Sequence, residues 1–141
     1  MTAEDKTAIR AVVTAIHKAL RDRDAAAVTA HYVSDAMVFD LAPPLSHTVD
    51  RASLVAWLGT WKGPVERQAR ELGITVSGDL ALWHGYFRTT ATTTAGDHAV
   101  WWERATLAFR REAGSWKVVH EHTSVPFYMD GSFRAAVDLE P

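Results

Sequence analysis

The chain has 141 residues, of which 48% are hydrophobic and 23% are charged, and its net charge is −2 at pH 7. This composition is typical of a globular protein, and the length allows one hydrophobic core but not two domains. A single domain is therefore expected over residues 1–141. The sequence contains no cysteine, which excludes disulfides and thiolate chemistry.

Charge and hydropathy also exclude two classes of partner. No run of Lys or Arg marks a surface for nucleic acid or for an anionic membrane. The first residues are polar and lead into an amphipathic pattern, unlike a signal peptide, and the longest apolar runs are far too short for a membrane span. We therefore expect a cytoplasmic protein that binds neither nucleic acid nor membrane.

The first part of the chain predicts two helices. Apolar residues recur at helical spacing from Ile9 onward, and they indicate a first helix that ends near Leu20. Asp24 can cap a second, short helix. The inner stripe of this second helix would carry Val28, His31 and Tyr32.

A strand, a loop and a third helix follow. Ala36–Asp40 is predicted as a short strand that ends in a carboxylate, and the two prolines of Leu41–Leu45 favour a loop. Asp50 starts the third helix, which ends before Lys62-Gly-Pro64. One face of this helix would hold Leu54, Trp57, Leu58 and Trp61.

The second half of the chain has the alternation of β-strands. The predicted strands are 65–76, 79–94, 97–111 and 115–125, and the short glycine-containing turns between them favour an antiparallel meander. The tail, Phe127 to Pro141, is expected to lie as a strap over a sheet edge or over a partner subunit. Helices followed by strands indicate an α+β fold with the helices on one face of the sheet.

Three segments carry a resemblance to a known family. They are Phe39–Leu45, Arg104-Ala-Thr106 and Trp116–Phe127, the last of which contains the pattern His-Glu-His-x-Ser-Val-Pro-Phe. With the order of helices and strands, they resemble a branch of the SnoaL-like, ketosteroid isomerase-like (nuclear-transport-factor-like) superfamily over nearly the whole chain. The resemblance implies three N-terminal helices on a strongly curved, mainly antiparallel sheet, a cone with an internal pocket. It also implies a homodimer.

The resemblance leaves the activity open, because this fold hosts isomerases, cyclases, dehydratases, epoxide hydrolases and non-catalytic binders. We predict cofactor-independent acid–base chemistry of the ketosteroid isomerase or polyketide cyclase type on a small apolar or carbonyl-bearing molecule. The alternative is a non-catalytic small-molecule binding or assembly module. A further alternative is epoxide hydrolysis, in which Asp40 and Arg104 would help to activate water.

Asp40 is the main catalytic candidate. Under the resemblance it lies where ketosteroid isomerases have the aspartate that moves the substrate proton. A carboxylate facing an apolar cavity is desolvated, which raises its pKa toward the range of a general base. A structural aspartate that binds the amides of the following loop is the alternative. The oxyanion positions implied by the resemblance carry Ile16 and Ala105, so steroid isomerisation itself is not expected.

The face of the last strand decides which of two neighbours reaches the pocket. In a regular strand, Val119, Glu121 and Thr123 share one face, and the hairpins of the superfamily place that face inward. His122 would then point outward. A single bulge would reverse the assignment and bring His122 into the pocket.

His84 is the second histidine candidate, and it lies beside Gly85, where a ligand or a neighbouring backbone would have room. We place it on the inner face of its strand, which it shares with Leu82 and Tyr86. With Asp40 and Glu121 it would form a cluster able to divide acid and base roles. A satisfied core histidine is the alternative.

The remaining candidates are assigned to ligand binding. The pocket wall would be formed by Trp57, Trp61, Tyr86 and Tyr128, with Arg104 and His122 as further ligand-binding residues. Arg104 could instead pair on the outer face with His122 or a dimer partner. His120 and His122 could converge on a metal, but no third ligand has a matching spacing, so neither a metal nor a cofactor is predicted.

Overall fold

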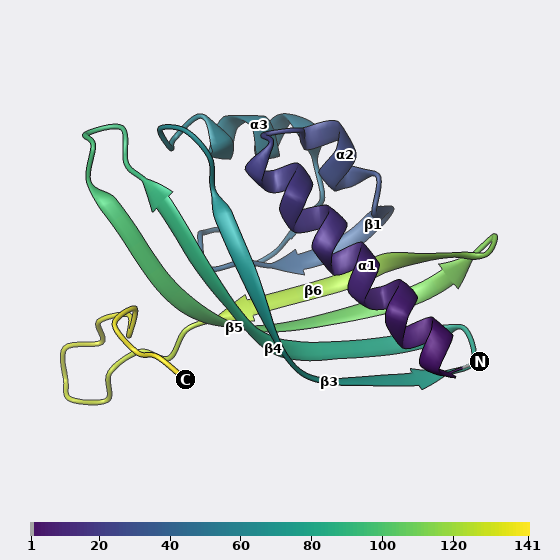
Figure 1. Ribbon diagram of the computed structural model, residues 1–141. Helices are drawn as coiled ribbons and strands as arrows, with labels where there is room; N and C mark the ends of the chain where they lie inside the picture. Colours follow the sequence, from purple (N-terminus) through teal and green to yellow (C-terminus); the bar gives the residue numbers. More distant parts are fainter. Residues whose placement is uncertain (1) are drawn as a thin grey trace.

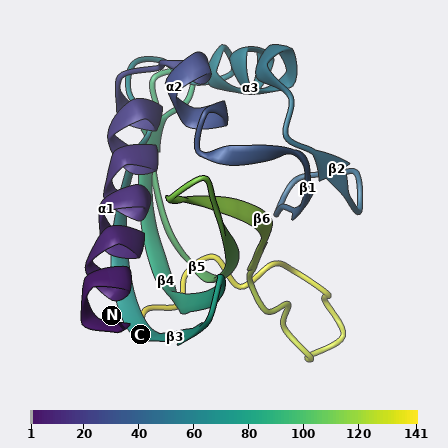
Figure 2. The same cartoon turned by 90° about the vertical axis from the view of Figure 1, so that its right-hand side faces the viewer.

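One strongly curved sheet organises the chain, and helices cover its concave side (Figures 1 and 2). The computed structural model describes residues 2–141 and confirms the expected α+β cone. Its helices in that range are α1 (Thr2–Arg21), α2 (Ala25–Thr29) and α3 (Arg51–Leu58). Its strands there are β1 (Tyr32–Phe39), β2 (His47–Thr48), β3 (Glu66–Ser77), β4 (Leu80–Thr92), β5 (His98–Glu112) and β6 (Ser115–Ser124).

The strand order β2-β1-β6-β5-β4-β3 brings the first strand beside the last. Strands β3 to β6 form the expected antiparallel meander, and β1 pairs in parallel with β6. In this register Val38 lies opposite Glu121 and Phe39 lies opposite His122. The end of β1, with Asp40 directly after it, is thus fixed next to the middle of β6.

Helix α1 packs its apolar stripe onto the sheet, because Ile9, Val13, Ile16 and Leu20 are buried at helical spacing. His17 is buried on the same side, with its ring edge-on to Phe87 at 4.6 Å between centroids. Burial, and then the nearby Arg67 charge, lower the pKa of His17 to about 3. His17 is therefore a neutral core residue of the helix.

The buried face of β4 is opposite to the predicted one. Trp83 and Phe87 are fully buried and stack at 5.3 Å, whereas His84 is exposed on the outer face. The inward placement of His84 and Tyr86 was wrong, because in a strand of period two the large aromatic side chains decide which set faces the core. Gly85 is buried on the same face as Trp83 and Phe87.

Strand β6 contains a bulge at the position that decides its faces. Ala108 pairs with His120 and Phe109 with Val118, so Val119 is the extra residue. Beyond the bulge Glu121 faces inward and His122 outward, which confirms the predicted orientation of both. Before the bulge it is Trp116 and Val118 that are buried, opposite to what a regular strand requires.

Several predicted boundaries shift. Asp24 and Asp50 are N-caps as expected. Tyr32, however, does not belong to α2 but begins β1, which therefore starts before the predicted strand Ala36–Asp40. Helix α3 ends at Leu58, and Trp61 lies beyond it in a bridge with Thr93. The two-residue strand β2, which follows the proline loop, was not predicted.

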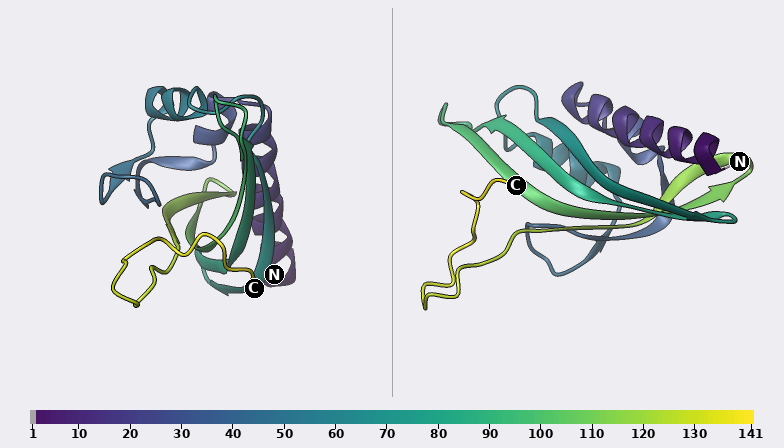
Figure 3. Two further views of the ribbon diagram at one scale, coloured as in Figure 1. Left: turned by 90° about the vertical axis from the view of Figure 1, so that its left-hand side faces the viewer. Right: turned by 60° about the horizontal axis from the view of Figure 1, so that its bottom comes forward.

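The C-terminal tail folds back on itself outside the sheet (Figure 3). Phe127 forms a bridge with Ala135, and Tyr128 donates a hydrogen bond to Asp138. None of the residues 127–141 lines the cavity described below. Among the helices of residues 2–141, none is both long and apolar enough to cross a membrane.

We predict that Gly85→Ala destabilises the protein by about 1–3 kcal/mol. A Cβ at this position would overlap the carbonyl oxygen of Arg70 on β3 and lie 2.9 Å from the Trp83 indole, and neither the backbone nor a buried ring can move aside. Gly73→Ala is the matched control, because its Cβ would meet only the exposed His84 ring at 2.9 Å. Urea unfolding compares the variants, and equal losses of stability would contradict this explanation.

Candidate active site

The cone encloses a cavity of about 750 Å³ at its open end, between the helices and the inner face of the sheet. Its walls are mainly apolar and are formed by Ile16, Leu20, Val28, Val38, Leu54, Trp57, Trp61 and Trp101. A smaller set of polar side chains reaches the same space, namely Tyr32, Asp40, His47, Arg67, Glu103 and Glu121. A mostly apolar cavity with a few converging polar groups is the usual form of a small-molecule site.

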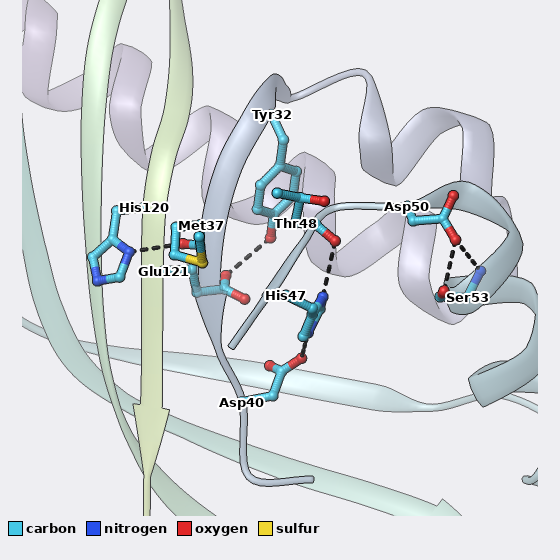
Figure 4. A network of polar contacts seen from close by, with 9 residues as sticks. All are labelled: Tyr32, Met37, Asp40, His47, Thr48, Asp50, Ser53, His120 and Glu121. Carbon is cyan, nitrogen blue, oxygen red and sulfur yellow. Dashed lines mark hydrogen bonds and ion pairs between the residues drawn. The ribbon is translucent and has the colours of Figure 1, made fainter. Parts of the chain in front are cut away.

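Glu121 is the buried carboxyl group of this cavity, with 8% of the residue exposed. Tyr32 donates a hydrogen bond from its hydroxyl to Glu121 Oε1 at 2.9 Å (Figure 4). Burial raises the pKa of Glu121 to about 7, although Arg67 opposes the shift. Burial and the neighbouring Glu121 charge also raise the pKa of Tyr32 well above its ordinary value. Near neutral pH, Glu121 is therefore the group of this pair that can offer a proton to a ligand.

Asp40 and His47 form a second pair at the mouth of the cavity (Figure 4). His47 Nε2 lies 2.5 Å from Asp40 Oδ2, and its Nδ1 lies 2.9 Å from the carbonyl oxygen of Thr48. Burial lowers the pKa of His47, but the hydrogen bonds to Thr48 and Asp40 outweigh it and leave a net rise. The side chain of Asp40 is 39% exposed, so the predicted desolvation is not found at Asp40 but at Glu121.

A third cluster of polar side chains, Arg67, Thr89 and Glu103, links β3, β4 and β5. The Arg67 guanidinium lies 3.2 Å from Glu103 Oε1 and donates from Nε to Thr89 Oγ1, also at 3.2 Å. Thr89 in turn donates to Glu103 Oε1 at 3.1 Å. Glu103 is almost fully buried, with 2% of its side chain exposed. The pair provides a neutralised cation inside the cavity.

Three tryptophans form an aromatic wall. Trp61 contacts Trp57 edge-on at 6.1 Å and lies 5.8 Å from Trp101. In residues 2–141 the buried side-chain polar atoms without a hydrogen-bond partner are the indole nitrogens of Trp61 and Trp101. A buried N–H without a partner is uncommon in proteins.

The structure brings together four of the candidates named from the sequence: Asp40, Glu121, Trp57 and Trp61. It excludes five others from the cavity wall, namely His84, Tyr86, Arg104, His122 and Tyr128.

The five excluded side chains belong to other surfaces. His84 and Tyr86 lie on the outer face of β4, and the half-buried Tyr128 belongs to the tail. Arg104 lies on the outer face and donates from Nε to Ser124 Oγ at 3.0 Å, so it does not reach the cavity that Asp40 lines. Within residues 2–141, no cluster of three or more His, Asp or Glu side chains could hold a metal ion.

Sequence reasoning missed four polar residues of the cavity: Tyr32, His47, Arg67 and Glu103. Tyr32 was assigned to a helix, and His47 follows a loop whose path depends on β2. The alternation of β5 marks Glu103 as inward, because it shares a face with Ala105 and Leu107. This was a usable signal, since a buried glutamate requires a cation such as Arg67.

Comparison with known proteins agrees with the cone fold, which is that of the NTF2-like class. The model of the SnoaL-like domain family matches residues 9–128, and the chain belongs to this family. An NTF2-like protein of unknown function from Pseudomonas putida KT2440 has 30% identity and a TM-score of 0.83, with 100% of this chain and 99% of that chain covered. No curated protein sequence matches.

Two structures of lower identity share the fold. One, from Novosphingobium aromaticivorans DSM 12444, is described as a "putative scytalone dehydratase". It has 18% identity and a TM-score of 0.80, over 96% of this chain and 93% of that chain. The other, from Streptomyces avermitilis, is described as a "putative dehydratase from the NTF2-like family". It has 15% identity and a TM-score of 0.78, over 88% of this chain and 97% of that chain. At these identities the likeness concerns the fold alone.

The buried Glu121 predicts a defined pH dependence of stability. Its folded-state pKa of about 7 exceeds the ordinary glutamate value of 4.5, so below pH 4.5 the group is protonated in both states. As the pH rises to 7 the unfolded state loses the proton first, and the free energy of unfolding falls. Glu121→Gln abolishes this loss. We expect the variant to gain about 3 kcal/mol over wild type between pH 4.5 and pH 8.

Urea unfolding followed by tryptophan fluorescence at these two pH values gives the difference. His17 titrates in both proteins, so its contribution cancels. Glu112→Gln is the control, because Glu112 is exposed and pairs with Arg110. A stability difference between Glu121→Gln and wild type that does not change with pH would show that Glu121 is ionised in the folded protein.

Proposed function

We propose that the protein is a cofactor-independent enzyme that performs acid–base chemistry, as an isomerase or lyase, on a small, neutral and largely apolar molecule bound in the cone cavity. The observation that carries the proposal is the presence of two carboxyl groups in one apolar cavity with opposite surroundings. Glu121 is buried and hydrogen-bonded to a phenol, whereas Asp40 is partly exposed and paired with His47. Such pairs of differently placed carboxyl groups divide the acid and base roles.

Asp40 is the general base of the proposal. Its Oδ2 lies 2.5 Å from His47 Nε2, and the Nδ1 of His47 lies 2.9 Å from the carbonyl oxygen of Thr48. In proton abstraction next to a carbonyl, the C–H electron pair would move into the forming enolate and the proton would pass to Asp40. Glu121, held by the hydrogen bond from Tyr32, would then donate a hydrogen bond to the oxygen on which the negative charge develops.

The cavity walls favour a neutral substrate. The aromatic wall of Trp57, Trp61 and Trp101 offers stacking surface to a planar or cyclic molecule. The unpartnered indole N–H groups of Trp61 and Trp101 would be satisfied by an oxygen acceptor of the ligand or by water. The carboxyl groups already present in the cavity disfavour an anionic ligand.

The two structural neighbours described as dehydratases support a lyase among the possible reactions. Elimination of water needs the same two parts, a base for the C–H proton and an acid for the leaving hydroxyl. The second candidate function is non-catalytic binding of a small molecule. It is favoured by the apolar wall alone and requires neither the Tyr32–Glu121 pair nor the Asp40–His47 pair.

The base role is tested with 2-tetralone, a neutral bicyclic ketone, as probe. We expect wild-type protein in D2O to accelerate exchange of its α-protons, followed by proton NMR. Asp40→Asn should reduce this acceleration roughly 100-fold to 10,000-fold, because the amide cannot accept the proton. Binding, measured by quenching of tryptophan fluorescence, should change little. Glu112→Gln is the control and should keep the wild-type rate. Binding of the ketone without exchange in wild type would favour the binder.

The acid role predicts the pH dependence of the same exchange reaction. Since Glu121 donates only when protonated, the rate should fall as the pH rises through about 7, where this group ionises. Glu121→Gln should lower the maximum rate on the order of 100-fold, and should remove this alkaline decline. An unchanged decline in Glu121→Gln would assign the alkaline limb to another group.

A further inference from the structure

Arg67 presents a problem of pairing within the cavity. An arginine and a buried carboxyl group in one apolar cavity attract each other strongly. Arg67 is near enough to Glu121 for its charge to oppose the effect of burial on that group. Glu121 nevertheless accepts its hydrogen bond from Tyr32, and the ion-pair partner of Arg67 is Glu103.

The guanidinium group is held from three sides. Glu103 pairs with its terminal nitrogen at 3.2 Å, and Thr89 accepts from its Nε at 3.2 Å. The Phe87 ring lies beneath it, 5.2 Å from the guanidinium carbon to the ring centroid. Thr89 and Phe87 are fully buried, so the group rests on the rigid centre of the sheet. A planar guanidinium with bonds in fixed directions loses them when it turns.

We propose that Glu103 is a positioning residue: it holds Arg67 against β4 and β5, and so prevents this cation from forming an ion pair with Glu121. Without Glu103, the positive charge of Arg67 beside Glu121 would lose its carboxylate partner. The ion pair would convert Glu121 from a proton donor into a carboxylate. The inference rests on the proposed function for its catalytic meaning, but the contacts that carry it are independent of any substrate.

The charged and titratable groups that face Glu121 come from four strands. They are Tyr32 and Asp40 at β1, His47 on β2, Arg67 on β3 and Glu103 on β5. His17 of α1 faces Phe87 and is neutral. Burial raises the pKa of Glu121 most, and Asp40 and Glu103 add to the rise, whereas Arg67 is the cation that opposes it. The position of Arg67 therefore influences the protonation of Glu121.

The test variant is Glu103→Gln, which keeps the size and one oxygen acceptor for Thr89 but removes the negative charge. Carboxyl-carbon NMR follows the titration of Glu121, assigned with Glu121→Gln. We expect its midpoint to fall by at least one pH unit from the wild-type value of about 7. The alkaline decline of 2-tetralone exchange should move by the same amount.

Two further variants distinguish the positioning of Arg67 by Glu103 from a general effect of the lost negative charge on Glu121. In Glu103→Gln with Arg67→Gln, Arg67 can no longer approach Glu121, and the midpoint should return at least to the wild-type value. Thr89→Val removes the hydroxyl that links Arg67 to Glu103 without changing any charge, and it should lower the midpoint by a smaller amount. Glu112→Gln, which removes an exposed charge from the same strand, should leave it unchanged.

An unchanged Glu121 midpoint in both Glu103→Gln and Thr89→Val would overturn the inference. So would a double variant that titrates as low as Glu103→Gln, because Arg67 would then not be the cause. A failure of the proposed function alone would look different. The wild-type protein would then show no exchange of the ketone protons, but the NMR midpoints of Glu121 in the variants would still move as stated.

Discussion

The site depends on one buried carboxyl group, that of Glu121, in an apolar cavity. Its burial is possible because β6 has an extra residue at Val119, which lets the strand bury two large apolar side chains at one end and Glu121 with Thr123 at the other. Without the bulge, one of these two sets would face outward. The same feature thus completes the hydrophobic core and directs an ionisable group into the cavity.

The parallel pairing of β1 with β6 supplies the partners. It places the Tyr32 hydroxyl on Glu121, and it brings Asp40, just past the end of β1, to the same cavity. The short strand β2 then returns along β1 and presents His47 to Asp40. Two hydrogen-bonded pairs with different exposure therefore face one ligand space, and this difference supports their division into proton donor and base.

The fold followed from the sequence because periodicity, caps and short turns are local signals. Asp40, Glu121, Trp57 and Trp61 were also found, since each ends a strand or belongs to a clear face. His84 was misplaced because side chains alternate between the two faces of β4, and a shift of one residue in this alternation changes its side of the sheet. Only the packing of Trp83 and Phe87 decides which set faces the core. His47 reaches Asp40 only because the short strand β2 folds back along β1, and Arg67 acts through partners far along the chain. No local pattern specifies either contact.

The most direct test of this account is the titration of Glu121 in the wild-type protein by carboxyl-carbon NMR, with Glu121→Gln for assignment. The account predicts that Glu121 titrates near pH 7. A Glu121 midpoint close to 4.5 would mean that the carboxyl group is solvated or ion-paired. The cavity would then lack its proton donor, and the proposed division of acid and base roles would be contradicted.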